Sequence, residues 1–215
     1  MLPHARIGDF RRARRRPAGR GCGGLRARRA SCIIGGLRDD GGDVRVATPR
    51  LILRRYRESD FRDLAAMVAD PGMFQFSDRG PMTGDEAWWR LLRHAGHWSL
   101  IGYGVVAIEE KDTGRFVGET GLSQFRRGLG ARFDARPEIT WSIIPECQGR
   151  GYALEGAKAA LDWMASLRPG PTVCLIHLGN EPSLKVAAKL GYEPFDEVEY
   201  KGYPARLMER AAAPR

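Results

Sequence analysis

Gln148-Gly149-Arg150-Gly151-Tyr152-Ala153 is the most informative stretch of the 215-residue sequence. It separates a predicted strand, Glu138–Ile144, from a predicted helix that ends near Leu167. Glycines in such a turn let the backbone approach a ligand closely, and the first N–H groups of the following helix have no intrahelical partner. Because the positive end of the helix dipole lies behind these amides, the stretch predicts a site for a diphosphate.

Two common phosphate loops do not fit this stretch. A Walker A loop ends in Gly-Lys-Ser/Thr, but here Tyr152-Ala153 follows Gly151. A dinucleotide-binding fingerprint needs a third glycine where this sequence has Leu154. The loop alone leaves open the alternative of an ordinary glycine-containing connection between a strand and a helix.

Hydrophobic patterns predict the elements that precede the loop. The expected strands lie within Thr48–Tyr56, Tyr103–Glu109, Arg115–Phe125 and Glu138–Ile144, and the expected helices begin near Ser59 and Thr83. The second helix carries a capping box, because Glu86 follows Thr83 by three residues. The turn Lys111–Gly114 is typical of a hairpin, and Gly128–Pro137 is expected to be a loop.

The pattern after the loop changes to a helical period. Apolar residues recur at three- and four-residue steps from Leu154 to Met164. A strand at Val173–His177, a helix at Asn180–Leu190 that ends at Gly191, and strands at Glu197–Tyr200 and Ala205–Met208 are expected to follow. This order of elements predicts an α+β fold in which helices pack on a mixed sheet.

The net charge of +9 is concentrated at the N-terminus. Residues 1–47 hold twelve arginines and four aspartates, whereas the remaining 168 residues carry a net charge of +1. The expected organisation is a disordered Arg/Gly-rich extension at 1–47, a domain at 48–210 and a tail at 211–215. The extension is either a polyanion-binding arm or, the interpretation that we favour, a leader that the working protein does not need. A nucleic-acid partner is expected only through it.

Several classes of protein are excluded by composition. No run of about eighteen apolar residues is present, so no membrane-spanning helix is expected. Arginine pairs near the N-terminus are not followed by the apolar core of an export signal. The four cysteines, Cys22, Cys32, Cys147 and Cys174, lack metal-ligand spacing. We therefore expect no metal, and a location in a reducing cytoplasm.

The loop and several other segments resemble the GNAT superfamily of N-acetyltransferases. The pyrophosphate loop of that superfamily reads Gln/Arg-x-x-Gly-x-Gly/Ala, and Gln148–Ala153 matches every defined position. Further matches lie at Thr48–Arg54, Phe116–Leu122, Pro137–Ile143, Asn180–Ser183 and Lys189–Tyr192. The resemblance covers about residues 48–210 and is nearest to the ribosomal-protein N-terminal acetyltransferase branch. It implies a mostly antiparallel sheet flanked by helices.

This resemblance implies that acetyl-CoA is a co-substrate and that its acetyl group passes directly to an amine. Ile143 and Ile144 would then pair with the pantetheine arm, and Asn180 would bind the pantetheine amides. Asn180 is alternatively a plain helix N-cap, and it can fill both roles. The loop residues Gln148, Gly149, Arg150, Gly151, Tyr152 and Ala153 would hold the diphosphate, with Arg150 adding its charge or merely lying on the surface.

The catalytic residues are less well defined by the resemblance. Many GNAT enzymes place a tyrosine, as general acid, seven residues after this asparagine, where this sequence has Ala187. The acid is therefore Ser183, a water molecule, or absent, and a thiol with a pKa of about 8.5 is a tolerable leaving group without help. For the base, Glu119 and Glu138 are the candidates on strands, each alternatively paired with an arginine or directed to solvent, and His177 is a third.

The ionisation of the acceptor amine gives one quantitative constraint. At pH 7 an α-amine with a pKa of about 7.8 is about 14% neutral, whereas roughly one lysine side chain in 2,500 is neutral. An enzyme without a strong base is expected to favour a peptide or protein N-terminus or a small primary amine of low pKa. The alternative is a catalytically weak GNAT fold that acts as a CoA-binding or protein-binding sensor, and either protein is expected to be a monomer or a homodimer.

Overall fold

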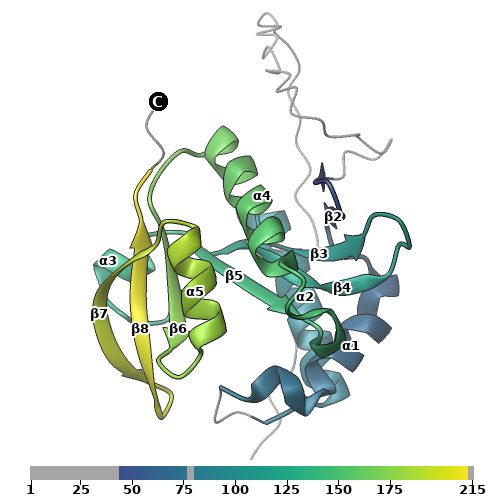
Figure 1. The fold of residues 1–215 in the computed structure, drawn as a ribbon, viewed down its shortest axis with the longest axis horizontal. Coiled ribbons are helices and arrows are strands. Elements are labelled where there is room, and N and C mark those ends of the chain that lie inside the picture. Colours follow the sequence, from purple (N-terminus) through teal and green to yellow (C-terminus); the bar gives the residue numbers. More distant parts are fainter. Residues whose placement is uncertain (1–43, 77–79, 213–215) are drawn as a thin grey trace, which may run out of the picture. The chain divides into compact units, whose positions relative to one another are not determined.

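The computed structural model describes residues 44–76 and 80–212 (Figure 1). Within these ranges the chain forms one eight-stranded sheet in the order β1-β2-β3-β4-β5-β6-β8-β7. The strands are β1 (Arg45–Ala47), β2 (Leu51–Arg54), β3 (Val105–Glu110), β4 (Phe116–Ser123), β5 (Glu138–Ile143), β6 (Thr172–His177), β7 (Glu193–Tyr200) and β8 (Tyr203–Arg210). Every neighbouring pair is antiparallel except β5 and β6, which are parallel. The expected α+β fold with a mostly antiparallel sheet is confirmed.

Helices cover both faces of the sheet. The structure contains α1 (Phe61–Ala69), α2 (Gly84–Ile101), α3 (Ala131–Asp134), α4 (Tyr152–Leu167) and α5 (Glu181–Lys189), with short 3-10 turns η1 (Glu58–Asp60), η2 (Pro71–Phe74) and η3 (Pro145–Cys147). Neighbouring residues of β4 show the two layers, because successive side chains point to opposite faces. Thr120 lies close to Gly156 of α4, whereas Glu119 contacts Arg90 of α2. Figure 1 shows α4 in front of the sheet and α1 and α2 behind it.

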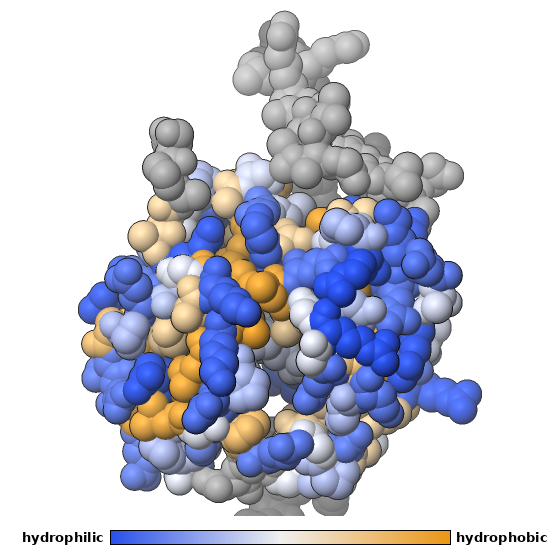
Figure 2. Space-filling view, in the orientation of Figure 1, coloured by the Kyte–Doolittle hydropathy of each residue, from blue (hydrophilic) through white to orange (hydrophobic). Residues whose placement is uncertain are grey.

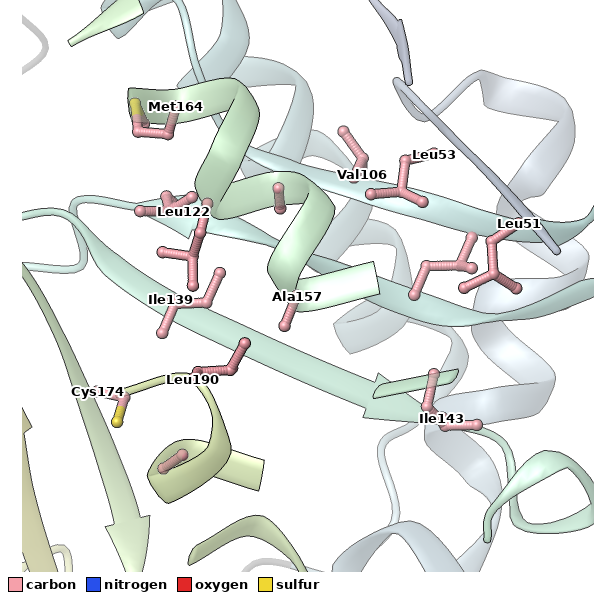
Figure 3. Close-up of a cluster of buried hydrophobic side chains, with 14 of the residues drawn as sticks. Leu51, Leu53, Val106, Leu122, Ile139, Ile143, Ala157, Met164, Cys174 and Leu190 are labelled. Carbon is pink, nitrogen blue, oxygen red and sulfur yellow. The ribbon is translucent and has the colours of Figure 1, made fainter. Parts of the chain in front are cut away.

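The main core lies between the sheet and α4. Alternate residues of the central strands point into it, among them Leu51, Leu53, Val106 and Leu122, and Ala157 and Met164 of α4 pack against them (Figure 3). The glycine at 118 is required by close packing within the sheet, since a Cβ there would lie 2.1 Å from the Ser142 carbonyl oxygen. A second cluster, of Leu64, Met67, Val68, Ala87 and Leu91, joins α1 to α2.

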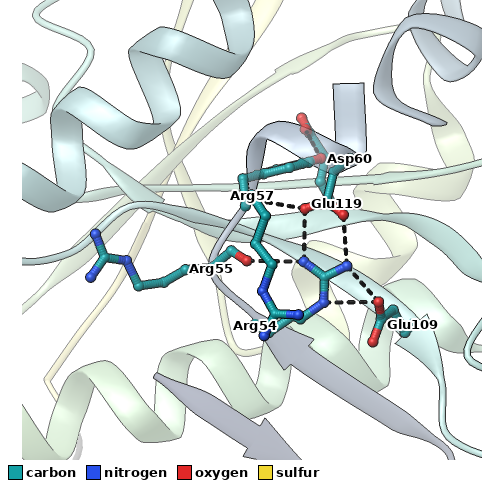
Figure 4. Close-up of polar contacts among 7 residues, drawn as sticks. Arg54, Arg55, Arg57, Asp60, Glu109 and Glu119 are labelled. Carbon is teal, nitrogen blue, oxygen red and sulfur yellow. Dashed lines mark hydrogen bonds and ion pairs between the residues drawn. The ribbon is translucent and has the colours of Figure 1, made fainter. Parts of the chain in front are cut away.

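Polar contacts fasten the start of α1 to the sheet (Figure 4). Arg54 on β2 donates from Nη1 and Nη2 to the two carboxylate oxygens of Asp60, at 2.7 and 2.8 Å. Its Nε donates to Glu109 on β3 at 2.8 Å. Burial disfavours the charged form of Asp60, but the hydrogen bonds from Arg54 and from the Arg57 amide hold its pKa below the ordinary value. The network fixes η1 and therefore the position at which α1 begins.

Strand β1 corrects the predicted boundary of the N-terminal extension. Arg45–Ala47 pairs with β2, and Val44 and Val46 pack against the main core. The sequence alone places Arg45–Ala47 in the predicted extension 1–47, because three residues carry no detectable period of their own. These residues form a strand only because they pair with β2. Residues 1–43, for which disorder is predicted, lie outside the described residues, as do residues 213–215 of the predicted tail.

The segment predicted as a loop at 128–137 contains the short helix α3. The Gly130 carbonyl accepts hydrogen bonds from the amides of Phe133 and Asp134, and Phe133 is buried. The last two strands are also longer than expected, because β7 begins at Glu193 and β8 at Tyr203. Among the described residues, no helix is long and apolar enough to span a bilayer.

Candidate functional site

The sheet opens between β5 and β6. These strands pair only where Glu138 faces Val173 and then diverge, while β6 pairs with β8 along its whole length on its other edge (Figure 1). The opening contains a cavity of about 230 Å³, and Figure 2 shows this face of the molecule hollowed below β5. Its lining comes from β5, β6, α5 and the segments around them: Phe76, Arg127, Glu138, Ile139, Thr140, Trp141, Leu175, Ile176, His177, Asn180, Ser183 and Tyr203.

The open edge of β5 presents backbone groups to this cavity. The Ile144 amide donates to the Val117 carbonyl at 3.0 Å, so this residue turns its amide toward β4. Because backbone groups alternate in direction along a strand, those of Ile143, Trp141 and Ile139 point the other way, toward the opening. Ile143, which the sequence predicted, therefore lies on the open edge, and Ile144, predicted with it, does not offer its amide there. Trp141 was missed because a sequence does not show where two strands separate.

The loop Gln148–Ala153 lies at the end of the same strand. Gly149 and Gly151 have φ angles of +74° and +81°, which glycine adopts without strain. Gly151 caps α4, and the first amide to bond within the helix is that of Glu155, which donates to the Gly151 carbonyl at 3.1 Å. The amides of Tyr152 and Ala153 precede it and have no acceptor within the helix. Amides of this kind suit an anion, so they are candidate groups for the diphosphate site, which stays a prediction.

Contacts from other elements hold this loop in place. Gln148 donates from Nε2 to the Ile143 carbonyl at 3.0 Å, which ties the loop to β5. Arg50 donates from Nη1 to the Arg150 carbonyl at 2.9 Å and from Nε to Glu155 at 2.7 Å. Burial opposes ionisation of Glu155, but hydrogen bonds from Thr48 and Arg50 hold its pKa below the ordinary value. The anchoring role of Arg50 was missed, because it depends on a contact across 100 residues.

The two charged or aromatic side chains of the loop turn toward β3. Arg150 lies 3.6 Å from Glu110, and the Tyr152 hydroxyl donates to the same carboxylate at 3.0 Å. Glu110 thus partly balances the charge of Arg150. The backbone amides of Tyr152 and Ala153 are therefore the candidate anion-binding groups of this loop.

Asn180 and Ser183 stand on the α5 side of the cavity. The Asn180 Oδ1 accepts a hydrogen bond from the Ser183 amide at 3.1 Å, so Asn180 caps the helix and keeps its amide NH₂ free of that bond. Ser183 Oγ accepts a hydrogen bond of 3.4 Å from Trp141 Nε1 across the opening. His177 also faces the cavity, with its Nδ1 accepting from the Gly179 amide and its ring stacked on Tyr203 at 5.5 Å.

Glu138 lies in the wall of the cavity and is paired with Arg127. Arg127 donates from Nε and Nη2 to the two carboxylate oxygens, at 2.6 and 2.7 Å. The Glu138 side chain is 5% exposed. Burial raises the pKa of Glu138 above its ordinary value, although the hydrogen bonds and charge of Arg127 act in the opposite direction. A carboxylate with a raised pKa holds a proton more readily, which suits a group that exchanges protons with a substrate.

Glu119 lies in a different environment on the other face of the sheet. It forms an ion pair with Arg90, lies 3.3 Å from His94 Nε2, and accepts a hydrogen bond of 2.8 Å from the Tyr56 hydroxyl. Burial disfavours its charge, but Arg90 and His94 hold the pKa of Glu119 well below the ordinary value. The side chain is fully buried and does not line the cavity. The structure therefore brings Glu138, Asn180 and Ser183 together and leaves Glu119 apart from them.

Comparisons with known proteins identify the family and the fold of this chain. The family model described as an acetyltransferase (GNAT) domain matches residues 50–193. A protein from Bordetella pertussis assigned to the GnaT acetyltransferase family is 32% identical, with 78% of this chain and 99% of that chain covered and a TM-score of 0.70. YkkB of Bacillus subtilis is 33% identical over 112 residues, which span 51% of this chain and 63% of YkkB.

A more distant solved structure shares the fold alone. The ribosomal-protein-S5-alanine acetyltransferase from Vibrio fischeri is 19% identical, with 79% of this chain and 97% of that chain covered and a TM-score of 0.60. Within the described residues, no group of three or more His, Cys, Asp or Glu side chains is placed to hold a metal ion.

Proposed function

The chain belongs to the GNAT acetyltransferase family, and from this we propose that it transfers the acetyl group of acetyl-CoA to a primary amine. The observation that carries the proposal is the opening between β5 and β6, which joins an amide-rich loop at one end to a cavity with a buried carboxylate at the other. One ligand that spans the opening would place its anionic part at the loop and its reactive part in the cavity.

The residues along the opening fit the parts of acetyl-CoA. The amides of the loop Gln148–Ala153 suit the diphosphate, with each charge-assisted hydrogen bond contributing roughly 1.5–3 kcal/mol. The Ile143 carbonyl is bonded to Gln148, so the open edge of β5 offers the Ile143 amide and the backbone groups of Trp141. These groups suit the amides of the pantetheine arm, as does the side chain of Asn180. The thioester supplies an activated acetyl group. Its position would be near Ser183 and Glu138, at the far end of the cavity.

The residues of the cavity support a direct transfer. The amine nitrogen attacks the thioester carbonyl carbon and the carbon–sulfur bond breaks. Glu138 accepts the proton that the amine loses, directly or through one water molecule. The sulfur leaves as a thiolate, which a thiol pKa of about 8.5 permits, and takes its proton from water. Ser183, whose oxygen accepts from Trp141, would donate a hydrogen bond to that sulfur without losing its own proton. Glu119 was a second candidate for the base, and we assign it instead to the packing of α2.

The acceptor is proposed to be a peptide or protein N-terminus or a small primary amine of low pKa. Among the described residues that line the cavity, Glu138 is the carboxylate and it is paired with Arg127, an arrangement that does not favour an acceptor with several positive charges. The experiment is thiol release from acetyl-CoA with peptide N-termini, amino acids, polyamines and aminoglycosides. Turnover with peptide N-termini or amino acids, abolished in Glu138→Gln, supports the proposal, whereas turnover with polyamines or aminoglycosides alone would contradict the proposed acceptor.

A second candidate function is a CoA-binding sensor. It is favoured by Ala187, which is fully buried in α5 at the position where many family members carry a tyrosine. A sensor would bind CoA, measured by calorimetry, and release no thiol with any amine in the panel. CoA binding together with amine-dependent turnover would exclude it.

A further inference from the structure

Arg127 is held more firmly than a surface arginine. It follows β4, and its guanidinium lies between the rings of Phe125, 4.7 Å from its centroid, and Tyr200, at 5.3 Å. Nη1 donates to the Tyr200 hydroxyl at 3.0 Å, while Nε and Nη2 both donate to the Glu138 carboxylate. The preceding residue, Arg126, has a φ of +49°, a left-handed conformation that is costly for a residue with a side chain. Strain of this kind persists where surrounding contacts require the backbone to take one path.

We propose that Arg127 is a positioning residue that holds both oxygens of the Glu138 carboxylate so that it meets the acceptor amine in one orientation. This inference rests on the proposed function and deepens it. A carboxylate has about four lone-pair sites, of which a two-point contact with arginine occupies two. The others are left for the proton of the amine or for a bridging water molecule.

Arg127 differs in charge and contact from the other ionisable groups near Glu138. Those groups are Asp134 on α3, Cys174 and His177 on β6, Tyr192, Tyr200 on β7 and Tyr203 on β8. Asp134 adds a like charge, which raises the pKa of Glu138. Burial raises the pKa values of Cys174 and Tyr192, so both are neutral near pH 7. Among the described residues, Arg127 is therefore the cation in hydrogen-bonding contact with Glu138.

The test uses the full-length protein and the acceptor amine identified by thiol release. Arg127→Gln removes the charge and the two-point contact, Arg127→Lys keeps the charge alone, and Tyr200→Phe removes the bond to Nη1. Arg132→Gln is the matched control, because Arg132 also lies over a ring, that of Phe195 at 4.1 Å, and pairs with a carboxylate, Glu209, at 3.0 Å. Arg132 does not line the cavity.

The measurement is the pH dependence of kcat at saturating acetyl-CoA and acceptor. An opposite charge in contact lowers the pKa of a carboxyl group by about 1–3 units, so its loss in Arg127→Gln is expected to move the acidic limb to higher pH by about that amount. We expect Arg127→Lys to show a smaller shift but a kcat at least about tenfold below the parent, because general-base catalysis depends on geometry. Tyr200→Phe should shift the acidic limb of the kcat profile slightly to higher pH, and Arg132→Gln should leave this limb in place.

The outcomes are distinguishable. An active parent whose acidic limb stays in place in both Arg127 variants would overturn this inference and leave the acetyltransferase proposal intact. A parent that releases no thiol with any amine would overturn the proposed function and the inference with it. CoA binding and melting temperature are measured for each variant. If Arg127→Gln does not fold, the pH profiles of Arg127→Lys and Tyr200→Phe test the inference instead. Each of these variants removes only part of the contacts that Arg127 makes.

Discussion

At the scale of single residues, glutamate lies in two different environments on neighbouring strands. Glu119 on β4 and Glu138 on β5 are both buried, and each is paired with one arginine. They differ in what else surrounds them. Glu119 is enclosed by α2 and Tyr56, whereas Glu138 lies beside a cavity. Their expected responses to the same substitution are therefore different.

Glu119→Gln is expected to lower the free energy of unfolding by about 3–5 kcal/mol, because it leaves the guanidinium of Arg90 buried without its counter-charge. Urea unfolding monitored by tryptophan fluorescence measures this change. The remaining folded protein is expected to keep the kcat of the parent. Glu138→Gln is the matched variant. It is expected to show the opposite pattern, with a large loss of kcat and a smaller loss of unfolding free energy. A fully stable Glu119→Gln with no turnover would show that Glu119 belongs to the catalytic machinery.

The acid stability of the protein is expected to depend on Glu119. Its pKa in the folded state lies below the ordinary value of 4.5, so folding favours its ionised form. The stability that this carboxylate contributes is therefore complete above about pH 5 and is lost progressively as the pH falls below 4.5. Glu119→Gln should flatten the dependence of unfolding free energy on pH between about pH 5 and pH 3 relative to the parent. An equally steep dependence in both proteins would assign the acid sensitivity to other carboxylates.

At the scale of elements, the candidate anion site is a loop that contacts from a helix and from a segment distant in sequence hold in place. Gly151 turns the chain into α4, while Arg50 beside β2 holds the Arg150 carbonyl and Glu155. The amides of the loop are thus oriented before a ligand arrives. Preorganisation of this kind reduces the conformational freedom that binding would otherwise remove.

Gly151→Ala is expected to weaken CoA binding, because a side chain at a φ of +81° costs about 1–2 kcal/mol. If the loop relieves this strain by changing its path, the dissociation constant measured by calorimetry should rise by about 5- to 30-fold. The control is Gly96→Ala in α2, where an added Cβ would meet nothing within 4 Å. That variant should keep the affinity and gain about 0.5–1 kcal/mol of stability. Equal affinity in both variants would contradict the assigned role of the loop.

The sequence was sufficient for elements whose pattern is local. The capping box at Thr83 and Glu86, the helical period of α4 and the loop at Gln148–Ala153 all lie where they were expected. β1 and the anchoring by Arg50 could not be predicted, because each depends on residues far away in the chain. The partners of the two glutamates were not predictable for the same reason. Alternation placed each carboxylate on a face but could not show which arginine would reach it.

At the scale of the whole described part, the candidate site exists because the sheet is incomplete. β5 and β6 are parallel neighbours that share one paired position, and β6 takes its remaining hydrogen bonds from β8. Beyond that position, the separation leaves one edge of β5 without a strand partner among the described residues. The sheet thus supplies both the cavity and a row of backbone groups that can pair with a ligand. These groups carry no net charge, so the charge of the chain gives no indication of them.

The boundary of the folded part is expected to lie at residue 44. Removal of residues 1–43 should leave the free energy of unfolding and the affinity for CoA unchanged, because β1 and Val44 stay in place. Removal of residues 1–47 should lower the unfolding free energy by about 1–3 kcal/mol, since it deletes the half-buried side chains of Val44 and Val46 and exposes the edge of β2. Urea denaturation of the two truncated proteins beside the full chain makes the comparison. Equal stability of both truncations would show that β1 contributes nothing and would return the boundary to residue 48.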